Sequence, residues 1–239
     1  MSFFACNKMF FAYKKQAKAS DFTHFISLPF FSQKIRLDLR EIQGQILCEI
    51  DNKHLDSCLI SNPNLFHLTL CMLSLKDTTK KAFVKRIFEE NNEKLANLLT
   101  LKNFRLNFNK ITCFSENNPD YIWPNDVIFL EPDPNEYMSI IHEISHLLIK
   151  DLMKFEIIDK TNFKTLNLIE DDKGRIRMDR IHLTLVRIKN TYKIPAKYLV
   201  EKLREEFKGI EIPVEFLDVS TRFEYDENKF YKPFFRRLL

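Results

Sequence analysis

Two short segments of this 239-residue chain carry the same pair of chemically useful side chains. The first, FHLTL, contains His67 and Thr69, and the second, IHLTL, contains His182 and Thr184. Residues i and i+2 of a strand point to the same face, so each segment, as a strand, presents an imidazole and a hydroxyl on one side and a leucine toward the core. One copy is typical of a core strand with a satisfied histidine, whereas two copies with apolar flanks favour a shared site.

Two imidazoles that face one another suit the cleavage of a phosphodiester without a metal. A neutral imidazole takes a proton from the attacking oxygen, and an imidazolium gives a proton to the leaving oxygen. The ordinary histidine pKa of about 6.5 allows both roles close to neutral pH. The hydroxyls of Thr69 and Thr184 would donate hydrogen bonds to the non-bridging phosphate oxygens and stabilise the transition state. The pattern therefore predicts His67 and His182 as catalytic residues and the two threonines as phosphate-binding residues.

A competing motif, HEISH, lies in the segment 135–155, whose apolar spacing predicts a helix. In a zinc metallopeptidase, His142 and His146 would bind the metal, Glu143 would act as the base and Glu170 is a candidate third ligand. At about 100° per residue, however, both histidines fall on the polar side of the helix. We therefore expect two solvated histidines on an ordinary packing helix, and a site that uses neither a metal nor a cofactor.

The composition predicts a soluble globular protein with a mild preference for anionic partners. Hydrophobic residues make up 45% and charged residues 29% of the chain, and the net charge is +4, which excludes a disordered chain, a collagen and a coiled coil. Only 3 residues are glycine. Neither G-x-G-x-x-G nor G-x-x-x-x-G-K-[ST] occurs, so Rossmann and P-loop nucleotide binding lack sequence support.

The five cysteines are widely spaced and form no C-x-x-C pair. This spacing indicates free thiols in a reducing, intracellular compartment, either the cytoplasm or the mitochondrion. The longest nearly apolar run, 65–75, is too short for membrane insertion, which needs about 20 residues. Residues 1–21 form a basic N-terminal arm, typical either of a targeting sequence or of a segment that docks on a partner.

The remaining patterns predict strands and helices in one domain, 22–239, built of two similar lobes. The charged segment 170–180 is expected to be a loop, either plain or, through Arg175, Arg177 and Arg180, a basic lid near the second motif. Strands are expected at 25–30, 65–75, 104–114, 127–130, 181–188 and 214–219, and helices at 33–50, 77–99, 135–155 and 195–207.

The segment 229–237, KFYKPFFRR, interleaves basic and aromatic residues. Such a segment either stacks on nucleotides and attracts phosphate, or forms an edge strand whose cations reach solvent. On the first interpretation, Tyr231 and Phe235 are substrate-binding residues.

The two H-L-T segments, about half a chain apart, resemble the paired H-x-[ST] motifs that define the two-histidine (2H) phosphoesterase superfamily. The segment HFISLP near the start and LEPDPNE before the long helix resemble the RNA ligase-like branch found in A-kinase anchoring proteins. The resemblance covers residues 22–235. It departs from the family pattern at Arg180-Ile181, where members often have proline directly before the histidine.

The resemblance implies an α+β fold, a bilobal and pseudo-symmetric domain with two antiparallel-type sheets and flanking helices around a central groove. It also implies a metal-independent phosphodiesterase acting on RNA ends or short oligonucleotides, at 2′,3′-cyclic phosphates or 2′,5′ linkages. The alternative is a non-catalytic structural subunit of a large assembly, organellar or not, that retains the fold and contacts other subunits through its arm. Kinase anchoring is disfavoured because no separate amphipathic helix follows the last strand.

Overall fold

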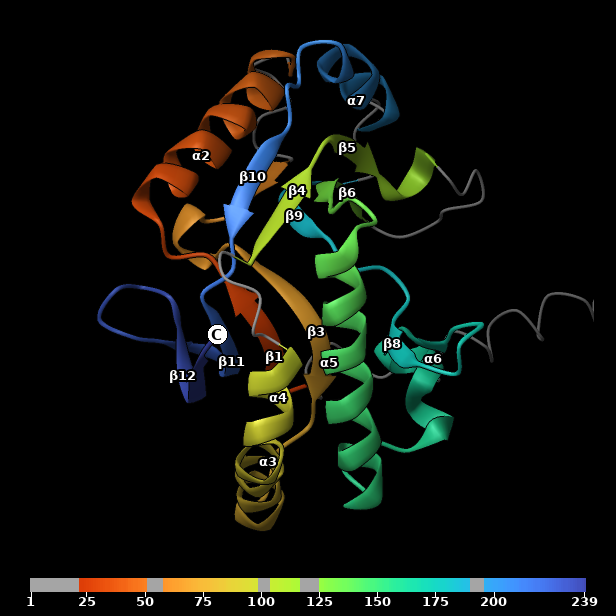
Figure 1. The fold of residues 1–239 in the computed structure, drawn as a ribbon. Helices are drawn as coiled ribbons and strands as arrows, with labels where there is room; N and C mark the ends of the chain where they lie inside the picture. The colour runs from red at the N-terminus through yellow and green to blue at the C-terminus, as the bar shows by residue number, and fades with distance from the viewer. Residues whose placement is uncertain (1–21, 51–57, 99–103, 117–124, 190–195) are drawn as a thin grey trace, which may run out of the picture.

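Two four-stranded antiparallel sheets flanked by helices form the body of the computed structural model (Figure 1). The structure describes residues 22–50, 58–98, 104–116, 125–189 and 196–239. The basic arm, 1–21, lies outside the described residues. Each sheet holds one of the two H-L-T segments, which confirms the α+β prediction and the division into two related halves.

The first sheet has the strand order β12-β11-β1-β3, with β12 at one edge and β3 at the other. Leu28 of β1 lies opposite Leu68 of β3, and both side chains are buried in the core. The strands are β12 (Tyr231–Leu238), β11 (Phe216–Tyr225), β1 (His24–Pro29) and β3 (His67–Leu73).

The second sheet has the order β2-β9-β6-β5. Leu183 of β9 lies opposite Leu130 of β6, and both are buried, as are Leu28 and Leu68 in the first sheet. The strands are β2 (Cys58–Ile60), β9 (Leu183–Lys189), β6 (Asn125–Glu131) and β5 (Lys110–Cys113).

Strands β3 and β9 share an irregularity directly after the threonine of each H-L-T segment. The register of β3 with β1 skips Leu70, and the register of β9 with β6 skips Leu185. A bulge of this kind adds one residue to one strand, so the alternation of faces shifts beyond it. The side chain three positions after each threonine, Met72 on β3 and Arg187 on β9, therefore shares the face of that threonine.

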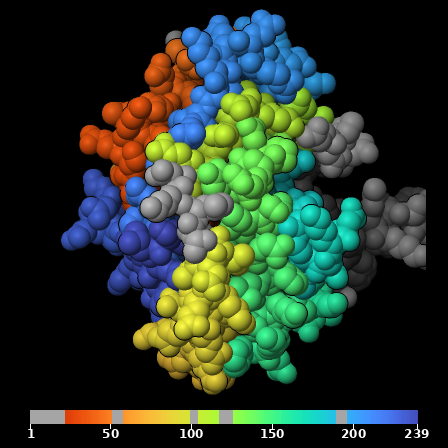
Figure 2. Space-filling model, viewed as in Figure 1, coloured from red at the N-terminus to blue at the C-terminus, as the bar shows by residue number. Residues whose placement is uncertain are grey.

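Helices pack against both sheets, α5 against β3 and α7 against β5 and β6. In Figure 2, α5 runs between the α3–α4 segment and the hairpin of β7 (Leu168–Glu170) and β8 (Ile176–Met178). None of the helices in the described ranges is long and apolar enough to cross a lipid bilayer. The α-helices are α2 (Gln33–Cys48), α3 (Thr78–Glu90), α4 (Asn92–Leu98), α5 (Glu136–Lys154), α6 (Phe163–Leu166) and α7 (Ala196–Arg204), and the short 3₁₀ turns are η3 (Pro63–Leu65), η4 (Phe114–Glu116) and η5 (Lys160–Asn162).

The segment 77–99, expected to be one helix, is divided into α3 and α4 at Asn91. The buried side-chain amide of Asn91 donates to the carbonyl of Ile87 at 2.9 Å and to the carboxylate of Asp151 on α5 at 2.6 Å. A side chain that bonds its own helix and a neighbouring one competes with the regular backbone pattern, which explains the break.

Two further predictions about elements are wrong. The single strand expected at 104–114 is β4 (Arg105–Phe108), which pairs with β10 (Ile210–Pro213), followed by β5 in the second sheet. The chain changes sheet at Asn109, whose amide donates to Asp133 at 2.5 Å. The loop expected at 170–180 contains β8 (Ile176–Met178), which forms a hairpin with β7 (Leu168–Glu170).

Leu183→Ala should lower the free energy of unfolding by about 2–5 kcal/mol, because Leu183 is fully buried beside the second histidine and truncation leaves a cavity. Urea unfolding of the wild type and the variant measures this difference. Leu37→Ala is the matched control: Leu37 is 57% exposed, so its loss should change stability by about 0.5 kcal/mol or less. Equal effects of the two substitutions would contradict the placement of Leu183 in the core.

Candidate active site

The four residues of the H-L-T segments lie at corresponding places in the two sheets. His67 begins β3, and His182 directly precedes β9. Each histidine and the threonine two residues later are half-buried, whereas the leucine between them is fully buried. The alternation expected of a strand therefore holds in both segments, and it turns both imidazoles and both hydroxyls away from the core.

Each imidazole is held by a backbone carbonyl two residues before it. Nδ1 of His67 lies 2.6 Å from the carbonyl oxygen of Leu65, and Nδ1 of His182 lies 3.3 Å from that of Arg180. A carbonyl only accepts, so Nδ1 carries the proton in both rings and Nε2 is the basic atom of the neutral imidazole. The hydroxyl of Thr69 lies 3.1 Å from Nε2 of His67, so the hydroxyl is within hydrogen-bond distance of the basic nitrogen.

Burial lowers the pKa of both histidines to about 4. The carbonyl hydrogen bonds act in the opposite direction, and the positive charge of Arg187 lowers both pKa values further. The charge of His67 also lowers the pKa of His182, so the two rings belong to one electrostatic site. Both imidazoles of the free protein are therefore neutral at neutral pH.

Arg187 is a residue of this site that periodicity alone does not find. A strict period of two places it on the face opposite Thr184, but the bulge at Leu185 returns it to the same face. Its charge lowers the pKa of Tyr231 as well as those of both histidines. The signal in the sequence is an arginine three residues after the threonine of the second motif, between the apolar residues Val186 and Ile188.

An aromatic cluster surrounds His67. The ring of Phe25 lies 5.0 Å from the imidazole, and the ring of Tyr231 meets it edge-on at 5.5 Å. Tyr231 in turn stacks on Tyr225 at 5.6 Å. Burial raises the pKa of the Tyr231 phenol, so this residue offers an uncharged ring and hydroxyl beside the first histidine.

The structure does not bring Phe235 to this cluster. Phe235 lies opposite Val219, a core residue of β11, and its ring contacts Phe88 of α3 at 5.0 Å. It therefore packs against the core on the other side of the sheet from Tyr231. Strict alternation would put Tyr231 and Phe235 on one face, but the pairing of β12 with β11 skips Phe234, and this irregularity separates the two residues.

The second histidine has its own pair of rings. Phe114 of η4 and Phe129 of β6 lie 5.1 Å and 5.0 Å from the imidazole of His182. The guanidinium carbon of Arg180 lies 5.7 Å from the centres of both rings. Arg180 thus approaches the site through its side chain as well as through the carbonyl that holds His182.

The HEISH motif on α5 is engaged in packing, and the expectation of two solvated histidines is wrong. His146 accepts a hydrogen bond from the backbone N–H of Ile176 at 3.0 Å, and Glu143 forms an ion pair with Arg175 at 3.1 Å. Both partners belong to the β7–β8 hairpin, which covers the polar side of α5. A helical projection identifies the side of a helix that meets the main core, but it does not show a second element on the other side.

The charged hairpin explains why the segment 170–180 is not a plain loop. Asp171 accepts hydrogen bonds from the backbone of Lys173 and Arg175 and pairs with the Arg175 guanidinium at 2.8 Å. These bonds lower the pKa of Asp171 to about 2. Across the described ranges, no group of three or more His, Cys, Asp or Glu side chains is placed to hold a metal ion.

The sequence matches the family model of the AKAP7 2′5′ RNA ligase-like domain over residues 22–236. The chain belongs to this family. A search of curated proteins finds no match to the chain. The family assignment covers both H-L-T segments and the strands of the two large sheets as far as residue 236 in β12, so the resemblance seen in the motifs extends over the described fold.

The chain is also similar to solved structures, of which that of Usb1 supports the assignment at the level of the fold. Usb1 of Kluyveromyces marxianus, with uridine monophosphate, is 8% identical, with 86% of this chain and 96% of that chain covered and a TM-score of 0.51. LigT of E. coli, with 3′-AMP, is 12% identical (91% and 97% covered, TM-score 0.47). TT0787 of Thermus thermophilus is 18% identical (91% and 94% covered, TM-score 0.47). The 2H phosphoesterase fold implied by the motifs is confirmed.

The free energy of unfolding of this AKAP7 2′5′ RNA ligase-like domain should fall as the pH drops from about 6.5, the unfolded histidine pKa, to about 4. In this window the unfolded chain binds more protons than the folded protein, so stability is fully present only above it. Each fully shifted histidine contributes at most about 1.4 kcal/mol per pH unit. Urea unfolding at several pH values measures the slope.

The double variant His67→Gln/His182→Gln should show a shallower slope. A residual slope is expected from His24 and His142, because burial lowers their pKa values to about 4 as well. An unchanged slope in the double variant would show that His67 and His182 titrate normally in the folded protein.

Proposed function

We propose that the protein is a metal-independent phosphodiesterase that cleaves RNA ends or short oligonucleotides, at 2′,5′ linkages or 2′,3′-cyclic phosphates. The observation that carries the proposal is the matched setting of His67 and His182. Each has a protonated Nδ1 fixed by a carbonyl and a threonine two residues later, and the charge of one acts on the other. Membership of the AKAP7 2′5′ RNA ligase-like family and the nucleotide on Usb1 support the choice of substrate.

The two imidazoles divide the transfer of protons. Nε2 of one neutral ring takes the proton of the attacking oxygen, and the protonated partner gives a proton to the leaving oxygen. In the free protein both pKa values are about 4, so the pair lacks that proton at neutral pH. A bound phosphodiester carries a negative charge that favours the imidazolium, so binding of the substrate raises the pKa of the pair and recruits the proton.

Three side chains on the same faces would hold the phosphate. The hydroxyls of Thr69 and Thr184 donate hydrogen bonds to the non-bridging oxygens, and the guanidinium of Arg187 neutralises their charge. All three donors are fixed by strands before the substrate arrives, so little reorganisation is needed as charge develops in the transition state.

The rings beside His67 suit a nucleobase. Tyr225 is 53% exposed and stacks on Tyr231, which contacts His67. Nearby in β11, Phe223 is 67% exposed and has a φ of 68°, a left-handed conformation that is unusual for a bulky residue. Exposed aromatic side chains of this kind stack on single-stranded bases. We assign Tyr231, with Tyr225, as the residues that position a base next to the reacting phosphate.

The wild type should turn over a 2′,5′-linked diadenylate, an oligonucleotide with a 2′,3′-cyclic phosphate, or both. His67→Ala and His182→Ala should each lower the rate about 10²–10⁴-fold, the usual value of a positioned proton-transfer group. Thr69→Val, Thr184→Val and Arg187→Gln should each lower kcat about tenfold or more, because each removes a phosphate donor. The double histidine variant should lose much less than the product of the single losses, since the pair acts as a unit.

His146→Gln is the matched control, because it removes a histidine engaged in packing, and it should retain the wild-type rate. EDTA should leave the rate unchanged, since no step uses a metal. If the pure wild type cleaves neither substrate, or both histidine variants are fully active, the enzymatic proposal fails. Loss of activity on chelation that zinc restores would point instead to the HEISH motif.

The pH profile of kcat/KM should fall about tenfold per pH unit above about pH 5, because kcat/KM reports the free protein, in which the singly protonated pair becomes rare. The fall belongs to the pair and not to one histidine. The corresponding limb of kcat should lie at higher pH, since the bound phosphodiester raises the pKa. Initial rates with the diadenylate at low and high concentration measure both profiles. Coincident limbs near pH 6.5 would contradict this electrostatic account.

A further inference from the structure

The face of the second sheet that carries Thr184 continues beyond the site. Phe129 of β6 lies opposite Thr184 on β9 and opposite Thr112 on β5. Glu131, two residues along β6, lies opposite Lys110 and therefore shares this face. Phe129 is fully buried, with Phe114 and Arg180 packed on its ring, so a ligand that extends from the reacting phosphate toward Lys110 would pass over Arg180.

Arg180 lies between the active site and the part of this face that continues toward Lys110. Its guanidinium lies over Phe114 and Phe129, the two rings that also contact His182. Within the described part of the chain no carboxylate forms an ion pair with Arg180. By contrast, the guanidinium of Arg177 donates to two backbone carbonyls of its own hairpin. Packing against the two rings therefore holds the Arg180 guanidinium in place. Among the described residues, no carboxylate neutralises its charge.

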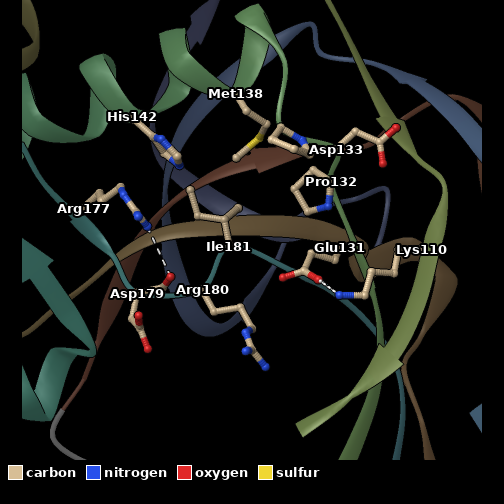
Figure 3. Close-up of a pocket in the computed structure, with 11 residues that line it drawn as sticks. Lys110, Glu131, Pro132, Asp133, Met138, His142, Arg177, Asp179, Arg180 and Ile181 are labelled. Atoms are coloured by element: carbon tan, nitrogen blue, oxygen red, sulfur yellow. Dashed lines mark hydrogen bonds and ion pairs between the residues drawn. The ribbon is translucent and has the colours of Figure 1, made fainter. Parts of the chain in front are cut away.

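A cavity of about 430 Å³, here called the α5 pocket, opens beside Arg180 at the start of α5. Figure 3 shows Arg177 on one side of the pocket, Lys110 on the other and Arg180 between them. The charged and titratable residues that line it are Lys110, Glu131, Asp133, His142, Arg177, Asp179 and Arg180.

Two of the three carboxylates of the α5 pocket are already engaged. Glu131 pairs with Lys110 at 2.8 Å, and Asp133 accepts from the amide of Asn109 at 2.5 Å. Burial and the charges of Arg177 and Arg175 keep His142 neutral by lowering its pKa to about 4. Asp179 is exposed and is the remaining acid. The three cations of the pocket balance its three carboxylates. Lys110 pairs with Glu131 and Arg177 with Asp171, so among the described residues Arg180 is the cation of the pocket that is left to bind an added anionic group.

We propose that Arg180, with the α5 pocket, binds a second phosphate of the substrate, one nucleotide away from the reacting phosphodiester on the His182 side. A guanidinium binds phosphate with two parallel hydrogen bonds while its plane remains stacked on a ring. This inference rests on the proposed function and deepens it. The preferred substrate is then an oligonucleotide with an additional phosphate, and not a bare dinucleotide or a mononucleoside cyclic phosphate.

The test compares three 2′,5′-linked diadenylates: bare, 5′-phosphorylated and 2′-phosphorylated. In the wild type, kcat/KM for one of the phosphorylated dimers should exceed that for the bare dimer about tenfold. Arg180→Leu, which keeps an apolar contact with the rings, should abolish this preference, so that kcat/KM falls about tenfold more on that phosphorylated dimer than on the bare dimer. Asp179→Asn should increase the preference, because it removes the remaining negative charge. Arg86→Gln removes an exposed cation of α3 and should leave the preference unchanged.

An equal loss on all three dimers in Arg180→Leu would overturn the proposal, since Arg180 would then act only by positioning His182. Equal rates of the wild type on all three would overturn it too. If the wild type cleaves none of them, calorimetry with adenosine 3′,5′-bisphosphate and adenosine 3′-monophosphate replaces turnover. Tighter binding of the bisphosphate that Arg180→Leu abolishes would support the second phosphate site even though the enzymatic proposal had failed. No difference between these two nucleotides in the wild type would reject it.

Discussion

The burial of one leucine in each H-L-T segment fixes the geometry of both halves of the site. Leu68 and Leu183 are fully buried, and each lies opposite another buried leucine on the neighbouring strand. Because side chains alternate along a strand, burying the leucine turns the histidine and the threonine beside it to the opposite face. A shift of one residue in either register would bury an imidazole and expose a leucine, so core packing and the position of the polar groups are specified together.

The two halves are alike in backbone and different in what surrounds the histidines. Both have the carbonyl that fixes Nδ1 and the bulge after the threonine. The first half adds Tyr231 and Tyr225, whereas the second half adds Arg187 and Arg180. A ligand placed between them would meet the two tyrosines on one side and, on the other, the two cations together with Phe114 and Phe129. The fold therefore supplies two equivalent groups for proton transfer, and the different side chains around them determine which way a substrate lies in the site.

Local patterns in the sequence were sufficient for the H-L-T segments, because alternation over three residues depends only on the strand itself. They were insufficient wherever the position of a residue depends on an element that lies far away in the sequence. The bulge that turns Arg187 toward the site depends on pairing with β6, and the role of His146 depends on a hairpin thirty residues later. The break at Asn91 depends on Asp151 of another helix. Strict alternation puts Tyr231 and Phe235 on one face, yet the irregularity at Phe234 in the pairing of β12 with β11 turns Phe235 toward Phe88.

The outer edge of the first sheet affects how this protein can associate with other chains. β12 forms that edge and carries Tyr231, and Pro233 near its middle has no N–H to offer. Lys232 and Arg236 are exposed along the same strand. Proline and cations at an edge oppose the addition of a strand from another molecule. Sheet-to-sheet association is therefore disfavoured next to the tyrosines, and this rim of the molecule remains accessible to small diffusing ligands.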